Sequence, residues 1–480
     1  MTAVLWSAAE MAAAMRAERA GPLPQGVTGI SIDSRTLAAG EACFAIQGDA
    51  RDGHDFVAAA LARGAALAVV AADRRAAMPA DAPLLVVADV LQGLIDLAKA
   101  SRARSTARIV AVTGSVGKTS SKEALRVALS ADGETHASAA SYNNHWGVPL
   151  SLARMPARAA YGVFEIGMNH AGEITPLVKL VRPHVAIVTT IEPVHLEHFG
   201  SLEAIADAKA EIFAGVEPGG SAVLNRDNAQ YARLAAAARA AGVSRIVRFG
   251  EHAEADARLV KLALLADGST VRATILGDDV TYKLGAPGRH VAINSLAVLA
   301  AAKLAGADLA LAAIALAGLE PPSGRGARVA LTLAGGTATL IDESYNANPA
   351  SMRAALALLA QTPVGARGRR IAVIGDMLEL GPEGAAMHAA LAEMIADCKV
   401  DLVFCSGPLM RALWDALPAA LRGAYAPDSA ALQPQVLAAI EAGDAVMIKG
   451  SLGSRMGPIV RALVNRYTRP ESRQAALAQG

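Results

Sequence analysis

Hydrophobic residues in the middle of the chain form short continuous runs separated by longer segments of helical pattern. The runs are rich in β-branched residues and cover 109–112, 162–166, 185–189 and 222–224. Apolar runs of this length are typical of strands buried on both faces. Their alternation with helices predicts a parallel sheet covered on both sides. Three later runs, at 259–264, 271–276 and 280–284, predict a small antiparallel addition.

Similar patterns occur on either side of this region. Strands are predicted before it at 27–32, 42–46, 66–70 and 84–87, and after it at 337–341, 370–374, 402–405 and 445–448. Between the second and third regions, the prolines and glycines of 320–326 end a helix and indicate a linker. The chain is therefore predicted to be a three-domain α/β protein. Its parts are a small α/β domain at 1–88, a central parallel-sheet domain at 89–320 and a Rossmann-like domain at 321–480.

Composition narrows the class of protein. The chain has 480 residues, 53% of them hydrophobic, and its 45 basic and 44 acidic residues give a formal net charge of +1. A high apolar content with little net charge excludes an intrinsically disordered chain. A balance this close to zero also argues against a protein that coats nucleic acid or an anionic membrane.

The sequence predicts neither a membrane span nor a targeting signal. The most apolar stretch, 291–319, is interrupted by Lys303 and Asp308, so we expect two buried helices there. Ser7 and Glu10 near the start have the spacing of a helix capping box. No zinc or disulfide spacing links the cysteines, and a reducing cytoplasm is expected. The cysteines are Cys43, Cys398 and Cys405.

The strongest chemical signal is a glycine-rich loop between a predicted strand and a predicted helix. The strand ends at Thr113 and is followed by Gly114-Ser-Val-Gly-Lys-Thr119. Backbone N–H groups of such a loop, together with the helix N-terminus, attract phosphate oxygens. We expect Lys118 to reach the β- and γ-phosphates and the Thr119 hydroxyl to hold Mg²⁺. The predicted nucleotide-binding residues are Thr113, Gly114, Ser115, Val116, Gly117, Lys118 and Thr119.

Only two residues separate the glycines of this loop, where the common phosphate loop has four. The shorter loop resembles that of the Mur ligase family, ATP-dependent enzymes that join amino acids or peptides in cell-wall precursor synthesis. The resemblance covers nearly all of the chain. Matching segments are 31–35, 47–56, 142–150, 165–174, 191–200, 206–213, 290–296, 323–328, 341–349, 375–381 and 449–456.

The resemblance implies two Mg²⁺ sites. Glu165 ends a predicted strand at the same sheet edge as the phosphate loop, and it would hold an ion together with Thr119. The alternative for Glu165 is a charged loop residue. His195 and a carbamylated Lys209 are implied as ligands of the second ion, with His198 as the rival histidine. The alternative for Lys209 is a solvated lysine on a helix surface. Catalytic roles are implied for Lys118, Lys209, His195 and Asn346.

The resemblance also implies which residues contact ATP. Asn294 would pair with adenine, unless it is a helix N-cap. Arg325 would reach the phosphates when the domains close, unless it is a solvated linker cation. Asp342 would lie near the ribose.

Substrate contacts are implied on all three domains. Ser34, Arg35, Asp52 and His54 resemble the UDP-binding face, although Arg35 could equally form an ion pair within the fold. The other implied substrate residues are Asn143, Asn144, His170, Tyr345, Asn348 and Arg455.

Within this resemblance to the Mur ligase family, the Tyr-Asn-Ala-Asn-Pro form of 345–349 is similar to that of one kind of member. The resemblance implies that the substrates are UDP-N-acetylmuramoyl-tripeptide and D-alanyl-D-alanine, which would be joined through an acyl phosphate for peptidoglycan synthesis. We expect a monomer. Two alternatives stay open: a related ligase that adds the third peptide residue, and a phosphate-loop switch ATPase that hydrolyses ATP without either substrate.

Overall fold

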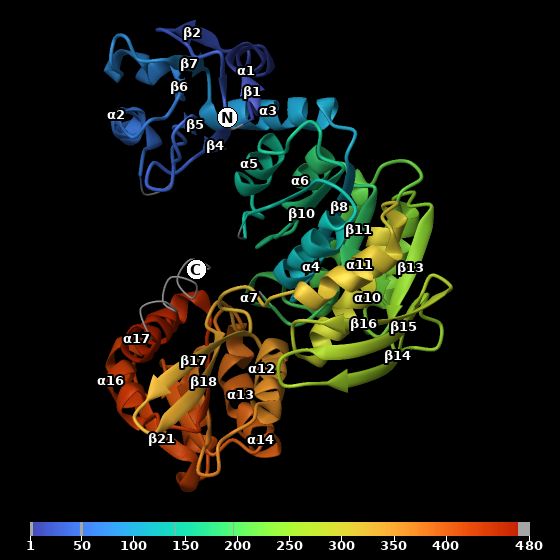
Figure 1. Ribbon diagram of the computed structural model, residues 1–480, viewed down its shortest axis with the longest axis vertical. Coiled ribbons are helices and arrows are strands. Elements are labelled where there is room, and N and C mark those ends of the chain that lie inside the picture. Colours follow the sequence, from blue (N-terminus) through green and yellow to red (C-terminus); the bar gives the residue numbers. More distant parts are fainter. Residues whose placement is uncertain (1–2, 49–50, 140, 195, 469–480) are drawn as a thin grey trace.

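The chain folds into three α/β units that follow one another in sequence (Figure 1). The computed structural model describes residues 3–48, 51–139, 141–194 and 196–468. Each unit is built on one main sheet with helices packed against it, and the central unit lies between the other two (Figure 1). The predicted three-domain α/β fold is therefore confirmed.

The first unit has a five-stranded sheet in the order β2-β7-β6-β5-β4. Its strands are β2 (Glu18–Ala20), β4 (Gly29–Ser31), β5 (Glu41–Phe44), β6 (Leu67–Ala71) and β7 (Leu84–Val87). All pair in parallel except β2, an antiparallel edge that the sequence pattern did not predict. A separate pair joins β1 (Trp6–Ser7) to β3 (Gly26–Val27). The helical segments are α1 (Ala8–Met15), η1 (Gly53–Phe56), α2 (Val57–Ala62) and η2 (Ala72–Ala77).

The central unit has a nine-stranded sheet in the order β16-β15-β14-β13-β12-β11-β8-β10-β9. Its parallel strands are β8 (Arg108–Thr113), β9 (Thr135–Ala137), β10 (Tyr161–Glu165), β11 (Val185–Val188), β12 (Ser221–Asn225) and β13 (Arg245–Gly250). The predicted antiparallel addition is confirmed as β14 (Ala257–Leu264), β15 (Ser269–Ile275) and β16 (Asp278–Leu284), which extend the same sheet. The short strand β9 and the strand β13 were not predicted.

Helices cover both faces of this sheet. They are α3 (Val90–Arg104), α4 (Lys118–Ser130), α5 (Gly147–Ala153), α6 (Ile174–Val181), α7 (Leu196–Phe199), α8 (Leu202–Ala210), η3 (Glu211–Gly215), α9 (Tyr231–Ala240), α10 (Arg289–Leu304), α11 (Leu309–Ala315) and η4 (Leu316–Gly318). The stretch 291–319 thus forms helices separated by a turn, as predicted. Within the described residues, every helix is too short or too polar to span a lipid bilayer.

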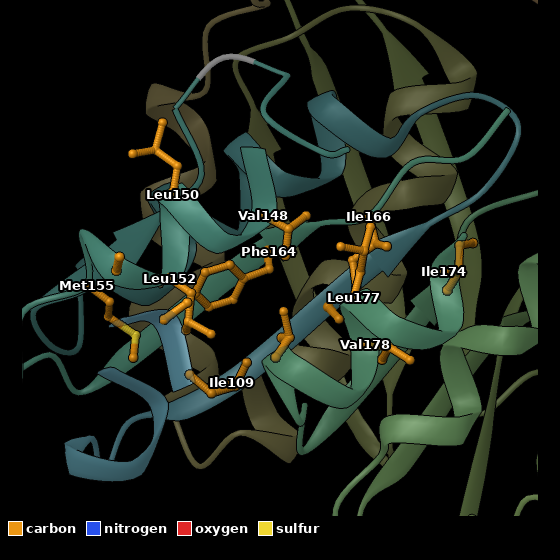
Figure 2. Packing of buried hydrophobic residues seen from close by; sticks show 14 of the residues in the cluster. Ile109, Val148, Leu150, Leu152, Met155, Phe164, Ile166, Ile174, Leu177 and Val178 are labelled. Carbon is orange, nitrogen blue, oxygen red and sulfur yellow. The ribbon is translucent and has the colours of Figure 1, made fainter. Parts of the chain in front are cut away.

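Successive residues of the central strands pack into two different cores. Ile109 of β8 belongs to one hydrophobic cluster and its neighbour Val110 to another, because side chains along a strand point alternately to opposite faces. Figure 2 shows the first of these cores, where Phe164 of β10 packs beside Val148 and Leu152 of α5. Burial on both faces explains why these strands read as continuous apolar runs.

The third unit has a six-stranded sheet in the order β17-β18-β22-β19-β20-β21. The strands are β17 (Ala327–Leu333), β18 (Gly336–Glu343), β19 (Arg370–Gly375), β20 (Leu402–Ser406), β21 (Arg422–Ala426) and β22 (Ala445–Lys449), and only β17 pairs antiparallel. The edge strands β17 and β21 were not predicted. The helical segments are α12 (Pro349–Gln361), η5 (Gly381–Glu383), α13 (Gly384–Ala389), α14 (Leu391–Asp397), α15 (Met410–Ala416), η6 (Ala419–Leu421), α16 (Ser429–Ala439), η7 (Leu452–Ser454) and α17 (Gly457–Tyr467).

Hydrogen bonds fasten both outer units to the central one. On the N-terminal side, the Trp6 indole N–H donates to the Ala153 carbonyl (2.9 Å), and Arg154 donates to the Ile30 carbonyl (2.7 Å). On the C-terminal side, Arg328 of β17 donates to the carbonyl of Ala266 in the β14–β15 turn. These contacts determine how the three units face one another.

Candidate active site

The carboxyl ends of the central strands open onto a cavity of about 680 Å³ between the central and C-terminal units. The cavity brings together several residues that lie far apart in the sequence. Those of the predicted set that line it include Lys118, Glu165, Asn294, Arg325, Asn346 and Asn348. One wall therefore comes from the phosphate loop and the other from α12 and the loop before it.

The predicted phosphate loop has a backbone that only glycine adopts easily. Gly114 and Gly117 have φ values of 145° and 84°. A Cβ atom at Gly114 would clash with Thr189, and one at Gly117 would clash with the Asn294 amide. Helix α4 begins directly after Gly117, so its free N–H groups point toward the loop. This arrangement matches the anion-binding geometry that the sequence predicts.

The Lys118 side chain folds back over the loop. Its Nζ donates to the carbonyls of Gly114 (2.7 Å) and Ser115 (3.3 Å). The pKa of Lys118 is lowered to about 8, mainly by burial; the charge of Glu165 opposes this shift and the charge of Arg325 adds to it. Lys118 is therefore a cation whose charge is sensitive to mildly alkaline pH.

Ser115 holds the phosphate loop against the segment that follows β11. Its hydroxyl donates to the Glu192 carbonyl (3.0 Å) and accepts from the Glu192 N–H (2.9 Å). Beside it, the Val116 carbonyl accepts from the Thr189 hydroxyl (2.6 Å). The Ser115 side chain thus joins two loops by hydrogen bonds, and Ser115 and Val116 both line the cavity.

Three buried oxygen atoms at this edge have no hydrogen-bond partner among the described residues: Thr113 Oγ1, Thr119 Oγ1 and Glu165 Oε2. Glu165 is 1% exposed, and its other oxygen accepts from the Asn143 amide (2.8 Å). A bare carboxylate oxygen and a bare hydroxyl are the donors that a hard cation such as Mg²⁺ prefers. The pair fits such an ion, with the remaining ligands left to phosphate and water.

A second metal site is not assembled by the described residues, which contain no group of three or more His, Cys, Asp or Glu side chains able to hold a metal. The predicted ligand His195 lies outside the residues that the structure describes. Its rival His198 is exposed, and its ring centroid lies 5.0 Å from that of His170.

Lys209 is not the solvated helix lysine of the alternative interpretation. It is only 2% exposed, and it has no hydrogen bond or ion pair with any described residue. Its neighbours are engaged elsewhere: Asp207 pairs with Arg233, and Glu211 accepts from Thr175. Burial holds the pKa of Lys209 well below its usual value, and the charge of Lys118 lowers the pKa further. Burial therefore favours the neutral form of this amine more than water does.

Asn294 and Arg325 both lie at the cavity. Asn294 is inside α10, whose N-cap is Gly288, so the N-cap alternative is wrong. Arg325 lies over the Tyr345 ring, 4.3 Å from its centroid, and is partly buried, so it is not a solvated linker cation. The linker therefore places the Arg325 guanidinium group at the cavity.

Asp342 holds the linker in place and does not line the cavity. Its carboxylate accepts from the Gly324 N–H (3.0 Å) and the Ser344 hydroxyl (2.6 Å). The next residue, Glu343, lines the cavity instead. Glu343 was not predicted from the sequence. Asp342 and Glu343 are adjacent acidic residues at the end of β18, and the sequence does not indicate which of the two side chains points toward the cavity.

The loop after β18 presents its amide side chains at the cavity. Asn348 is the N-cap of α12, where its Oδ1 accepts from the Ser351 N–H (2.9 Å), while its buried Nδ2 has no partner among the described residues. Asn346 is exposed toward the cavity, and only a local hydrogen bond to Ala347 engages its side chain. Arg455 is exposed in a left-handed turn and is not part of the cavity lining.

The predicted residues of the first unit are engaged locally. His54 is buried, with Nε2 accepting from the Ala71 N–H (3.0 Å) and Nδ1 facing Asp52 (2.6 Å). Both nitrogens of that ring are therefore used inside the fold. Arg35 forms an ion pair with Asp33 (2.7 Å), as its alternative predicted, although its side chain is 79% exposed.

Three other predicted substrate residues also lie apart from the cavity lining. The Ser34 carbonyl accepts from Arg63, the Asn144 side chain accepts from the Gly147 N–H, and His170 faces Glu173. Any substrate contact made by Ser34, Asn144 or His170 must therefore lie outside this cavity.

The fold and this cavity define a three-domain, phosphate-loop nucleotide-binding enzyme. The chain matches the models of the Mur ligase family catalytic domain over residues 26–102, the Mur ligase middle domain over 112–302 and the Mur ligase glutamate ligase domain over 325–452. The chain belongs to the Mur ligase family, whose members are ATP-dependent ligases, so the predicted family is confirmed.

Two relatives that are at least 30% identical to this chain have the same name. The chain is 35% identical to UDP-N-acetylmuramoyl-tripeptide–D-alanyl-D-alanine ligase of Escherichia coli, over 92% of this chain and 94% of the relative. It is 30% identical to the enzyme of the same name from Rickettsia prowazekii, over 90% and 94%. Among solved structures, MurF from Acinetobacter baumannii has a TM-score of 0.80 at 29% identity and covers 96% of this chain and 99% of its own.

The isolated burial of Lys209 predicts a stabilising substitution. Lys209→Met keeps the length of the side chain and removes a buried amine without a partner, so we expect the free energy of unfolding to rise by about 1–4 kcal/mol. Urea unfolding, followed by circular dichroism in buffer free of nucleotide and divalent cations, measures the change.

A matched control is Lys99→Met, because Lys99 is exposed and pairs only with Asp96. Its effect should stay within about 0.5 kcal/mol. Loss of stability in Lys209→Met would show that the native state gives this amine a favourable partner.

Proposed function

We propose that this protein is an ATP-dependent amide ligase that joins D-alanyl-D-alanine to UDP-N-acetylmuramoyl-tripeptide during peptidoglycan precursor synthesis in the cytoplasm. The observation that carries the proposal is the shared cavity. Lys118 and Glu165 of the phosphate-loop unit face Asn346 and Asn348 of the C-terminal unit across it. Full-length similarity to ligases of that name supports the choice of substrates.

The reaction follows from the poor reactivity of a carboxylate toward amines. The terminal carboxylate of the tripeptide attacks the γ-phosphate of ATP, ADP leaves, and an acyl phosphate forms. The amine of D-alanyl-D-alanine then adds to the acyl carbon, and the tetrahedral intermediate expels phosphate as the amine proton is lost. In this scheme the protein supplies positioning and charge instead of a covalent intermediate.

The cationic side chains serve the phosphoryl transfer. Lys118 would leave the carbonyls of Gly114 and Ser115 and bind phosphate oxygens instead, since these are stronger acceptors. Arg325, held over Tyr345, adds a second charge from the linker side. A cavity between two units would also limit the access of water to the acyl phosphate.

Thr119 and Glu165 are the proposed Mg²⁺ ligands. Asn143 engages one Glu165 oxygen and leaves the other bare, so the carboxylate is oriented before any ion arrives. When bound, Mg²⁺ neutralises charge on the phosphoryl oxygens. His195 is proposed as a ligand of a second ion on family resemblance alone.

Lys209 is proposed to carry a carbamate. A neutral amine is the form that adds to CO₂, and burial favours that form here. Addition and loss of a proton convert the amine into a carboxylate on a long arm, which is a hard oxygen ligand.

The substrate dependence of phosphate release tests the proposed function. With ATP, the tripeptide nucleotide and D-alanyl-D-alanine together, we expect phosphate release matched by amide product, and little release when either acceptor is omitted. Lys118→Ala should abolish both while leaving the circular dichroism spectrum unchanged.

Each alternative function predicts a different dependence of phosphate release on the added substrates. A switch ATPase would release phosphate with ATP alone. A ligase for the third peptide residue would need the dipeptide nucleotide and a free amino acid.

The lowered pKa of Lys118 predicts that nucleotide binding depends on pH. Below pH 8 the Lys118 amine is charged and strengthens the binding of ADP, whereas above pH 8 this amine loses its charge in the free protein. We expect ADP to bind about tenfold more weakly at pH 9 than at pH 7. Isothermal titration calorimetry across this range measures the effect.

Lys118→Arg is the control for the pH profile, because a guanidinium stays charged at pH 9. The profile of this variant should be flatter than that of the wild type, in which Glu165, Arg325 and Lys209 also face the amine. An equally steep profile in Lys118→Arg would assign the titration to another group.

The carbamate has its own test. Lys209→Ala should ligate at least about a hundredfold more slowly, because a metal-bound ligand is lost, and added acetate or formate should restore part of the rate. Lys99→Ala, on an exposed helix surface, should ligate normally with or without the added carboxylate. Unchanged ligation by Lys209→Ala would rule out the carbamate.

A further inference from the structure

The ends of two neighbouring strands in the C-terminal sheet carry an ion pair whose lysine is buried. Glu343 ends β18 and Lys449 ends β22, and the parallel register places these residues opposite each other. Lys449 is 1% exposed, and its Nζ lies 3.2 Å from Glu343 Oε2. The same Nζ donates to the main-chain carbonyl of Asn346 at 2.9 Å.

One ammonium group therefore connects two segments that line the cavity. An ammonium removed from water is costly unless it is paired and hydrogen-bonded, so its two acceptors are strongly held where they are. Asn346 belongs to the short loop between β18 and α12. Asn348 anchors one end of that loop by capping α12, and Asp342 anchors the other by binding Ser344. Lys449 fixes the middle of the loop through its hydrogen bond to the Asn346 carbonyl.

The residues fixed in this way face the place where a nucleotide would bind. Glu343 lines the large cavity together with Lys118 and Asn294, and it lines a smaller adjoining cavity with Ser120 and His290. Tyr345, in the same loop, carries Arg325 on its ring. A displacement of the loop would therefore move an acid and a guanidinium group at once.

We infer that Lys449 is a positioning residue, which holds Glu343 and the loop from Ser344 to Asn348 in the arrangement that receives the nucleotide. The inference rests on the proposed function only in taking the ligand of the phosphate loop to be ATP or ADP. Lys449 itself lies at the cavity lining, but its Nζ is engaged by Glu343 and the Asn346 carbonyl, and it acts through these two acceptors. Its burial and its existing hydrogen bonds leave it poorly placed to serve, with Arg455, as a carboxylate-binding residue.

Lys449→Met tests the inference in the full-length protein. Without the ammonium, Glu343 and the Asn346 carbonyl lose their donor, and we expect ADP to bind about tenfold more weakly by calorimetry. Hydrogen exchange of the free protein should also become faster in the peptide that covers residues 344–348. A lysine that merely touched the nucleotide would leave exchange in the free protein unchanged.

Arg369→Met is the matched control. Arg369 pairs with buried Asp444 (2.8 Å) at the opposite end of the same sheet, just before β19 and β22. This variant also removes the partner of a buried carboxylate from the domain, so it should lose stability as well. It should bind ADP within twofold of the wild type and leave exchange of the 344–348 peptide unaltered.

The double variant Lys449→Met with Glu343→Gln covers the case in which the single variant folds poorly. Removing both charges relieves the unpaired buried carboxylate, so stability should recover. The Asn346 carbonyl still lacks its donor, so fast exchange of the loop and weak ADP binding should persist. Wild-type exchange and affinity in either Lys449 variant, or equal weakening in Arg369→Met, would overturn the inference.

These measurements need no ligation. If the wild type binds ADP but makes no amide product, the proposed function fails while the role of Lys449 is still decided by exchange and affinity.

Discussion

Parallel pairing among β8, β10 and β11 brings the parts of the site together. Val112 lies opposite Glu165, and Thr113 lies opposite Val188. A slip of one residue in either ladder would exchange the side chains of the two cores, so close packing within both cores maintains this register. The loops after the three strands consequently start at one level of the sheet. For this reason three features lie close together. They are the phosphate loop, the Glu165 oxygen without a hydrogen-bond partner, and the segment after β11 to which Ser115 is hydrogen-bonded.

Two lysines near the phosphate loop, Lys118 and Lys209, lie in surroundings that disfavour their charged forms. The charge of Lys118 lowers the pKa of Lys209, and Glu165 counteracts the lowering of the pKa of Lys118. Such an arrangement is unfavourable in the free protein and is relieved when phosphate oxygens enter. Lys449 differs, because its charge is neutralised inside the protein and maintains a loop. In our proposals, Lys118 therefore serves nucleotide binding on one wall of the cavity, and Lys449 positions a loop on the other.

Neighbouring residues with similar chemistry were the hardest to assign from sequence. Asp342 and Glu343 are adjacent acids at a strand end, and the pleat turns one into the linker and the other into the cavity. His54 lies in a segment that resembles a nucleotide-binding face, yet its ring completes hydrogen bonds within its own domain. Local sequence patterns indicate which kinds of residue lie at a strand end or in a loop. The direction in which each side chain points depends on partners that are distant in the sequence.

The sequence alone determined the α/β class, the position of the phosphate loop, the linker and the family. It could do so because apolar periodicity and the need for glycine are local properties of the chain. Edge strands such as β17 and β21 escaped prediction, since their pairing depends on neighbours instead of on an apolar run. The environment of Lys209 was decided only by tertiary structure. The same helix could have shown that lysine to water, and packing against the central sheet buried it instead and lowered its pKa.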